Sequence, residues 1–137
     1  MLVNIGLLMS IFDTSILISA LAGETWAEKA MEMYSGSGLA TTVINKYELL
    51  KGRSFRTEKE NRVIRHLLEN LLIRDLDDSA VSRAAQLFDE LKVRGKRIDE
   101  FDILIAAISI ANNEILVVSD KHFDSINYDK IINIKHE

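Results

Sequence analysis

Apolar residues recur along the chain in short continuous runs separated by longer amphipathic stretches. The runs predict strands at Ser10–Phe12, Leu39–Thr41, Leu71–Leu76, Ile115–Val118 and Ile131–Ile134. Most of these runs are apolar throughout instead of alternating with polar residues, which is typical of strands covered on both faces. Strands that alternate with helices form parallel sheets. The pattern therefore predicts an α/β fold, a three-layer α/β/α domain with a mostly parallel sheet of four to five strands.

Capping residues mark where the helices between these strands begin. The expected caps are Thr14 or Ser15, Thr42, Thr57, Asp77 or Asp78, and Asp99. The corresponding helices run to about Tyr34, from Val43 to Lys51, to about Asn70, to Gly95, and from Phe101 to Ala111. Thr57 and Glu60 have the spacing of a capping box. In the helix that ends at Gly95, the apolar residues at helical spacing are Val81, Ala84, Ala85, Phe88 and Leu91.

The length of 137 residues suits one domain, and no Pro/Gly/Ser-rich linker divides the chain. We therefore expect a single domain over residues 1–137, with residues 1–8 as an N-terminal extension if Met9 is the native start. The absence of cysteine excludes disulfides and thiolate chemistry. The apolar stretch from Ile5 to Ala22 lacks a preceding Lys or Arg and contains Asp13. It therefore predicts neither a secretory signal nor a membrane span, and we expect a cytoplasmic protein.

Four acidic residues fall where such a fold places its ligand site. Asp13 directly follows the first strand, and Asp120 follows the Ile115–Val118 strand. Asp102 lies in the first turn of its helix and Glu48 in the second turn of the helix that Thr42 caps. Because ligands of open parallel sheets bind beyond the carboxyl ends of the strands, we expect the four carboxylates to converge there.

Converging carboxylates repel one another and raise one another's pKa unless a cation neutralises them. A set of oxygen ligands without His or Cys favours Mg²⁺ or Mn²⁺. Each acid also has a simpler explanation, since Asp13 could cap a helix, Asp120 could occupy a turn and Asp102 could face a helix dipole. Glu48 could face solvent. Capping does not explain an acid inside a helix at the same edge, so the combination favours a metal site.

The segments around these acids resemble the PIN-domain family, and most closely its VapC-type toxin ribonucleases of type II toxin–antitoxin systems. The resemblance extends from about Met9 to Ile134. It rests on Phe12–Ser15, Tyr47–Gly52, Arg97–Ala107 and Val118–Phe123. It implies a PIN-like domain in which Asp13, Glu48, Asp102 and Asp120 are the catalytic and metal-binding residues. Ser119 stands where the family more often has Thr, and it is expected with Thr14 to hold the carboxylates. Asp124 is interpreted as a surface residue.

The resemblance further implies an endoribonuclease dependent on Mg²⁺ or Mn²⁺ that hydrolyses RNA phosphodiester bonds with a metal-activated water. Its implied partners are an RNA substrate, a VapB-type antitoxin and a second copy of the chain in a homodimer. The helix containing Trp26 and the Thr57–Asn70 helix are the expected antitoxin surfaces. The alternative is a nuclease-inactive PIN-like module that binds RNA or acts as a scaffold. A haloacid-dehalogenase-type phosphatase fits poorly, because Ser15 stands where its second Asp is needed.

The net charge of −4 at first disfavours a nucleic-acid substrate, but the four acids account for all of it. Two basic groups remain as candidate contacts for RNA phosphates. They are Lys51, Arg53 and Arg56, and Lys92, Arg94, Lys96 and Arg97. The alternative for each group is a solvated helix end, where cations are favoured by the helix dipole.

Overall fold

The computed structural model describes residues 9–36 and 38–135, so the predicted extension over residues 1–8 lies outside the described residues. Five strands form one sheet. They are β1 (Ser10–Phe12), β2 (Leu39–Thr42), β3 (Leu72–Arg74), β4 (Ile115–Val118) and β5 (Ile131–Asn133). All four pairings are parallel and the order is β3-β2-β1-β4-β5, which places β1 at the centre. The predicted three-layer fold is confirmed, and the strand positions agree with the apolar runs.

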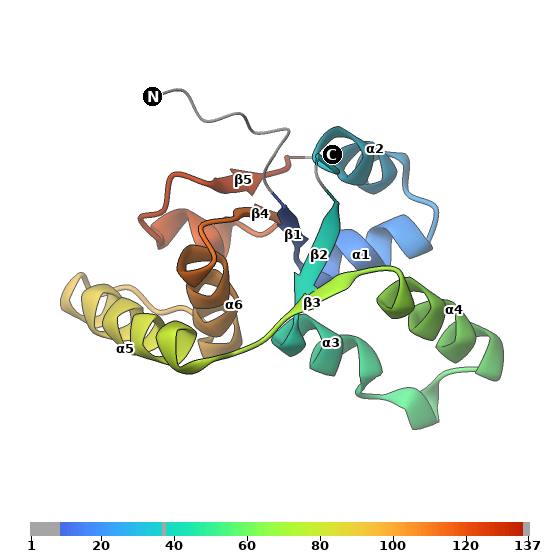
Figure 1. The fold of residues 1–137 in the computed structure, drawn as a ribbon, viewed down its shortest axis with the longest axis horizontal. Helices are drawn as coiled ribbons and strands as arrows, with labels where there is room; N and C mark the ends of the chain where they lie inside the picture. The colour runs from blue at the N-terminus through green and yellow to red at the C-terminus, as the bar shows by residue number, and fades with distance from the viewer. Residues whose placement is uncertain (1–8, 37, 136–137) are drawn as a thin grey trace.

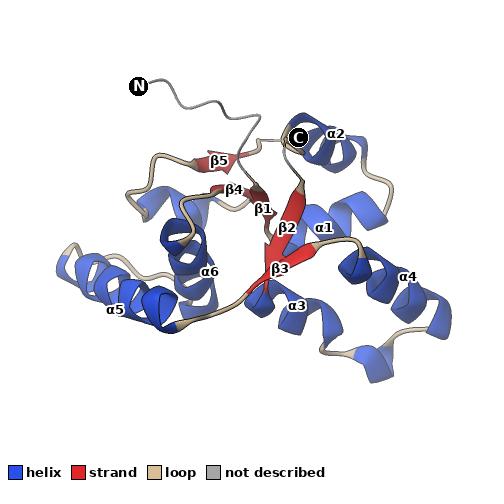
Figure 2. Cartoon of the chain, viewed as in Figure 1, coloured by secondary structure: helices blue, strands red, loops and turns tan. Residues whose placement is uncertain are grey.

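Six α-helices connect the strands and cover both faces of the sheet (Figures 1 and 2). They are α1 (Thr14–Leu21), α2 (Thr25–Met33), α3 (Val43–Leu50), α4 (Glu58–Glu69), α5 (Asp78–Val93) and α6 (Glu100–Ala111). Short 3-10 helices lie at η2 (Arg53–Phe55) and η3 (Lys121–Ser125). The caps predicted at Thr42, Thr57 and Asp99 each accept a backbone N–H, as does Asp77. These local signals were sufficient because a cap and its helix are close in sequence.

The single long helix predicted from Thr14 or Ser15 to Tyr34 is wrong. The chain forms α1 and α2 instead, separated at Gly23, which has a φ of +81°. A left-handed residue ends a helix because its carbonyl no longer points along the axis, and glycine adopts this conformation without strain. The predicted cap is also wrong by one residue, since Asp13 occupies the N-cap position, although its side chain makes no capping hydrogen bond. That carboxylate is therefore available for another role.

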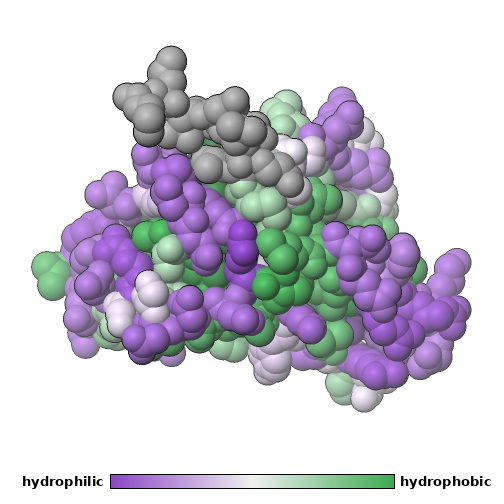
Figure 3. Space-filling view, viewed as in Figure 1, coloured by the Kyte–Doolittle hydropathy of each residue, from purple (hydrophilic) through white to green (hydrophobic). Residues whose placement is uncertain are grey.

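Successive residues of the central strand point into two separate cores. Ile11 packs with α5 and α6 on one face, whereas Phe12 packs with α1, α2 and α4 on the other. This is the two-residue period of a strand buried on both sides. Val81 and Phe88 share the helical spacing of the apolar residues on α5 but are 48% and 41% exposed. In Figure 3, polar residues gather over the α4 and α5 sides of the molecule, with apolar residues between them.

The fold brings the carboxyl ends of β1, β2 and β4 to one edge of the sheet. Helix α3 begins directly at the end of β2, and only Asp13 separates β1 from α1 (Figure 1). Such short connections leave the first turns of these helices at the same edge as the strand ends. None of the helices in the described ranges is long and apolar enough to cross a membrane.

Candidate active site

Asp13 is the buried centre of the predicted acidic cluster. Its side chain lies at the end of β1 and the residue is only 7% exposed. The backbone N–H of Asp13 donates to the Val117 carbonyl at 3.0 Å, which ties this position to β4. The Asn45 amide donates to Asp13 Oδ1 at 3.0 Å. Burial nevertheless dominates and raises the pKa of Asp13 to about 6, with further upward contributions from the charges of Glu48 and Asp120.

Glu48 is held at the same edge by a hydrogen bond from α1. The Thr14 hydroxyl donates to Glu48 Oε1 at 2.8 Å and accepts a bond of 2.9 Å from the Asn45 amide. Thr42 fixes Asn45 in turn, because the Thr42 backbone N–H and hydroxyl both donate to Asn45 Oδ1. Thr14 therefore orients a carboxylate, as predicted. Glu48 is half-buried, so its side chain is directed toward the cluster and does not face open solvent.

Asp102 lies in the first turn of α6, beside the N-cap residue Asp99, whose side chain accepts the Phe101 backbone N–H at 2.8 Å. Burial, followed by the charges of Asp13, Asp99, Asp120 and Glu48 in that order, raises the pKa of Asp102 to about 7. The contributions of these four acids indicate that carboxylates from four separate segments share one electrostatic environment. That the four acids form one metal site stays a prediction.

Asp120 is the most accessible member of the cluster, with a side chain 43% exposed. It accepts the His122 backbone N–H at 2.9 Å, which caps η3, and the His122 ring nitrogen lies 3.3 Å from the same oxygen. Asp124 lies further along η3, is exposed, and accepts a 3.0 Å bond from the Asn133 amide. The interpretation of Asp124 as a surface residue agrees with this position.

Ser119 does not hold a carboxylate directly, so that part of its predicted role is wrong. Its hydroxyl lies 2.9 Å from the Ser15 hydroxyl, and Ser15 in turn reaches Asp13 Oδ2 at 3.5 Å. The reason is geometric, because α1 begins immediately after β1 and places Ser15 between Ser119 and the acid. Ser119 connects the end of β4 to α1, and its influence on Asp13 passes through Ser15.

The donor set fits a hard divalent cation in its chemistry. The acids offer only oxygen ligands, and two of them have raised pKa values, chiefly because they are buried and in part because other acids lie near them. As the side chains stand, no group of three acidic or histidine residues within the described ranges is close enough to hold one ion. Glu48, Asp102 and Asp120 are the partly exposed members, so binding an ion would require these carboxylates to close around it.

Comparison with known proteins agrees with this arrangement. Residues 10–127 match the model of the PIN domain. The chain belongs to the PIN-domain family. One curated relative of this PIN domain is Ribonuclease VapC1 of Methanocaldococcus jannaschii, 28% identical over 115 residues that cover 83% of this chain and 78% of the relative.

Solved structures share the fold of this PIN domain. VapBC2 from Rickettsia felis, bound to a DNA fragment from its promoter, superposes with a TM-score of 0.81 at 24% identity, covering 91% of this chain and 98% of that one. VapBC-1 from nontypeable Haemophilus influenzae gives 0.79 at 22% identity, with 91% and 97% covered. VapBC-5 from Mycobacterium tuberculosis gives 0.70 at 23% identity, with 93% and 98% covered. At these identities, the likeness shows a common fold.

Three residues of this PIN domain's site were not predicted as site residues. Asn45 contacts Asp13 and Thr14, Ser15 connects Ser119 to Asp13, and Asp99 adds a negative charge beside Asp102. Asn45 carried a usable signal, because it stands three residues after the cap Thr42 and so lies in the first turn at the end of β2. Nothing in the sequence distinguished Ser15 from the other hydroxyl residues of α1.

The two predicted basic groups have different surroundings. In the first, Arg56 bonds Asn61 Oδ1 at 3.0 Å and the Leu50 carbonyl at 3.4 Å, so it stabilises the turn between α3 and α4. Lys51 lies over the rings of Tyr47 and Phe101. Arg53 is exposed in η2.

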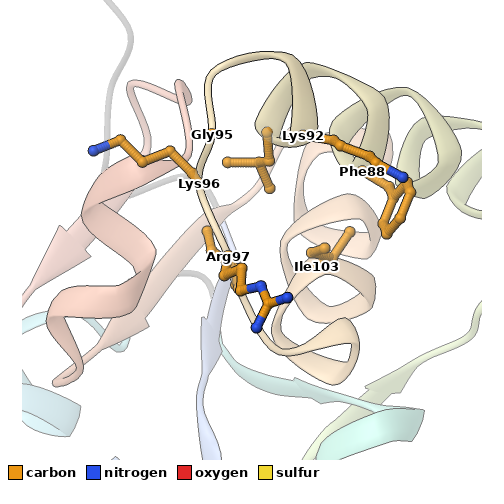
Figure 4. Close-up of a pocket in the computed structure, with 8 residues that line it drawn as sticks. Phe88, Lys92, Gly95, Lys96, Arg97 and Ile103 are labelled. Atoms are coloured by element: carbon orange, nitrogen blue, oxygen red, sulfur yellow. The ribbon is translucent and has the colours of Figure 1, made fainter.

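The second basic group surrounds a cavity between α5 and α6. The cavity has a volume of about 390 Å³, and its lining includes Phe88, Lys92, Lys96, Arg97 and Ile103 (Figure 4). Figure 4 shows Lys92 extending toward Phe88, Arg97 lying beside the start of α6, and Lys96 pointing away from the cavity. Arg94 is exposed and does not line it.

Proposed function

We propose that this PIN domain is an endoribonuclease dependent on Mg²⁺ or Mn²⁺ and the toxin of a VapBC-type toxin–antitoxin pair. The observation that carries the proposal is the convergence of Asp13, Glu48, Asp102 and Asp120, with the pKa of Asp13 and Asp102 raised. Uncompensated carboxylates at the ligand-binding edge of a parallel sheet favour a cationic cofactor. The relationship to a protein named Ribonuclease VapC1 supports RNA as the substrate.

The four acids are the proposed ligands of the cation. Asp13 is the most firmly positioned of them, since Asn45 and the strand backbone both hold it. Glu48 is oriented by Thr14 and is suited to bind the ion or to accept a proton from the attacking water. When bound, a divalent ion lowers the pKa of a water molecule and neutralises charge on the phosphate. This chemistry would allow a water oxygen to replace a ribose oxygen at the phosphorus, with Glu48 placed to accept the proton of the water.

The RNA backbone is proposed to approach this site along the exposed cations. Arg97 and Lys92 lie on the α5–α6 side and Lys51 on the α3 side, so positive charge flanks the acids on two sides. Lys96 points outward, and Arg53 and Arg94 are exposed. Arg56 is a weaker candidate, because its guanidinium is engaged by Asn61 and Leu50. Such contacts provide affinity without reading sequence.

The proposal is tested by replacing Asp102 with Asn and measuring RNA cleavage in Mg²⁺ and in EDTA. The substitution preserves size and removes one ligand charge, so we expect cleavage to fall by about 100-fold or more. We expect EDTA to abolish cleavage by the unchanged protein. Undiminished cleavage under either condition would contradict the mechanism. A urea unfolding curve for the variant shows whether it is folded.

The second candidate is a nuclease-inactive module that binds RNA or acts as a scaffold. The four acids favour the enzyme, because a module without catalysis gains nothing from a cluster whose repulsion destabilises the fold. Thermal stabilisation by Mg²⁺ or Mn²⁺ separates an intact metal site from a decayed one. A protein that the metal stabilises but that cuts no RNA would favour the module.

A groove between α1 and α4 is the proposed binding site for the VapB-type antitoxin. The groove has a volume of about 500 Å³ and is lined by Ile18, Leu21, Ala22, Arg56, Lys59, Glu60, Val63 and Ile64. Exposed apolar residues beside charged ones suit an amphipathic helix of a partner. The proposed partner then contacts α1 and α4. The helix predicted to contain Trp26 included α1, so both helices predicted as antitoxin surfaces contribute to the groove, although Trp26 itself lies on α2. The solved VapBC complexes support a partner of this class.

The homodimer and the cytoplasmic location stay predictions. Val81 and Phe88 on α5 are exposed apolar residues suited to a contact between copies. Sedimentation equilibrium of the purified protein measures the oligomeric state, and fractionation of cells measures the location. A monomer at all concentrations would contradict the first prediction.

A further inference from the structure

Two aromatic rings lie beside the acidic site at the junction of α3 and α6. Tyr47 immediately precedes Glu48, and Phe101 immediately precedes Asp102. Their ring centroids are 5.7 Å apart and the planes meet at 88°, an edge-to-face contact. Tyr47 is nevertheless 54% exposed, so its ring is not part of either core. Packing in a core does not explain why this exposed ring is fixed next to two candidate catalytic acids.

A cation completes the cluster. Lys51 lies one turn after Tyr47 on the same side of α3, with its ammonium 5.5 Å from the Tyr47 centroid and 5.8 Å from that of Phe101. The residue is exposed, so its long side chain can exchange the rings for a phosphate at little cost. The three residues thus combine an aromatic surface with a mobile positive charge, which are the two elements that single-stranded nucleic-acid sites use.

We propose that Tyr47, Phe101 and Lys51 form a base-stacking subsite for single-stranded RNA beside the cleavage centre. A base of the bound strand stacks on the exposed part of the Tyr47 ring, while Phe101 supports that ring from its edge. Lys51 moves from the rings to a phosphate of the same strand. Because a base must leave its own helical stack to reach Tyr47, the subsite favours single-stranded over double-stranded RNA. The inference deepens the proposed ribonuclease function and rests on it.

Comparison with the other exposed aromatic residues shows why the position matters. Phe55 is 93% exposed in η2, and Phe88 pairs with Lys92 on α5 at 5.8 Å. Neither is adjacent in sequence to one of the four acids, whereas both members of the Tyr47–Phe101 pair are. Phe55 is therefore the matched control, since its removal deletes an exposed ring elsewhere on the surface.

The first experiment places a fluorescent ring at the subsite. In a protein that carries Asp102→Asn to stop cleavage and Trp26→Phe to remove the native tryptophan, Tyr47→Trp is compared with Phe55→Trp. Each protein is titrated in Mg²⁺ with a labelled 12-nucleotide oligoadenylate and with a 12-base-pair RNA duplex, and anisotropy of the label reports binding. We expect the single strand to quench Tyr47→Trp but not Phe55→Trp, and the duplex to quench neither. Binding of the oligoadenylate without quenching of Tyr47→Trp would overturn the subsite and leave the proposed function standing.

The second experiment measures cleavage of a single-stranded RNA by Tyr47→Ala, Tyr47→Phe and Phe55→Ala in the otherwise unchanged protein. Loss of one stacked base raises KM by about tenfold for Tyr47→Ala, with kcat within about threefold of the unchanged protein. Tyr47→Phe retains the ring and is expected to behave normally, as is Phe55→Ala. An unchanged KM in Tyr47→Ala, or an equal rise in Phe55→Ala, would overturn the inference. If the unchanged protein neither binds nor cleaves RNA, the proposed function itself fails and the subsite fails with it.

Discussion

The Thr14 hydroxyl donates a 2.8 Å hydrogen bond to Glu48 Oε1, joining the first residue of α1 to the second turn of α3. These residues are 34 positions apart in the chain. The same hydroxyl accepts the Asn45 amide, which also donates to Asp13, so one small network fixes two of the four acids. Carboxylates held by such partners are oriented before a ligand arrives, which lowers the cost of binding an ion.

Replacing Thr14 with Val is expected to weaken the site without unfolding the protein. Valine has nearly the same shape but no hydroxyl, so Glu48 loses its donor and Asn45 loses an acceptor. Residues that orient metal ligands typically contribute 10- to 100-fold to metal affinity or activity. We expect RNA cleavage to fall by about that factor and the Mg²⁺ concentration needed for half-maximal rate to rise. Thr14→Ser restores the hydroxyl and is expected to retain most activity, whereas equal losses in both variants would contradict an orienting role.

The metal-free protein is expected to lose stability as the pH rises from about 4 to about 7. The folded-state pKa of Asp13 is about 6 and that of Asp102 about 7, both above the usual value of 3.8 because burial disfavours the charged form. The folded state therefore keeps protons that the unfolded chain has lost, and raising the pH favours unfolding. For Asp13, the effect is on the order of 3 kcal/mol at most. Urea unfolding in EDTA across this range measures the slope.

The double variant Asp13→Asn with Asp102→Asn is the control for this pH dependence. Asparagine carries no charge in either state, so the decrease between pH 4 and 7 is expected to flatten. Mg²⁺ acts in the opposite direction, because it binds the deprotonated acids and competes with protons. We expect Mg²⁺ to raise the melting temperature of the unchanged protein more at pH 8 than at pH 5.5. Equal stabilisation at both pH values would contradict binding at these acids.

Asp120 and Asp124 are expected to differ sharply when each is replaced with Asn. Both lie near the end of β4, but Asp120 shares the environment of Asp13 and Asp102, whereas Asp124 is exposed and bonded to Asn133. Asp120→Asn is expected to lower RNA cleavage by about 100-fold, since it removes a proposed ligand. Asp124→Asn is expected to stay within about threefold of the unchanged protein. A comparable loss in Asp124→Asn would assign that residue to the site.

Charge introduced into the groove between α1 and α4 is expected to block the antitoxin without affecting cleavage. Ile18 and Val63 are 51% and 42% exposed there, so a glutamate at either position is tolerated by the fold. The partner's apolar face would have to bury that charge, which costs several kcal/mol when it lacks a counter-ion. Co-purification with a co-expressed VapB-type antitoxin measures binding. Thr25→Glu, outside the groove residues, is the matched surface control, and retained binding by Ile18→Glu would contradict the assignment.

The sequence by itself determined the order of strands and helices, the parallel sheet and the caps at Thr42, Thr57 and Asp99. These features depend on residues a few positions apart or on continuous apolar runs, so they are visible along the chain. The rule that ligands bind at the carboxyl ends of parallel strands then selected the four acids as the predicted site. The break at Gly23 was missed because the apolar pattern of α1 and α2 continues across it, although the glycine marked the position.

Only the tertiary structure decided which side chains meet. That Asn45 holds Asp13, that Thr14 holds Glu48 and that Ser119 contacts Ser15 depends on how far each helix turns after its strand, which no local pattern encodes. The exposure of Tyr47 beside Phe101 could not be predicted for the same reason. In the sequence, an aromatic residue with apolar neighbours looks like a core residue, and only the packing of the helices shows that it is exposed. Periodicity determines which elements form. The angles at which they pack determine the site, because hydrogen bonds between distant residues require a precision that only the assembled core provides.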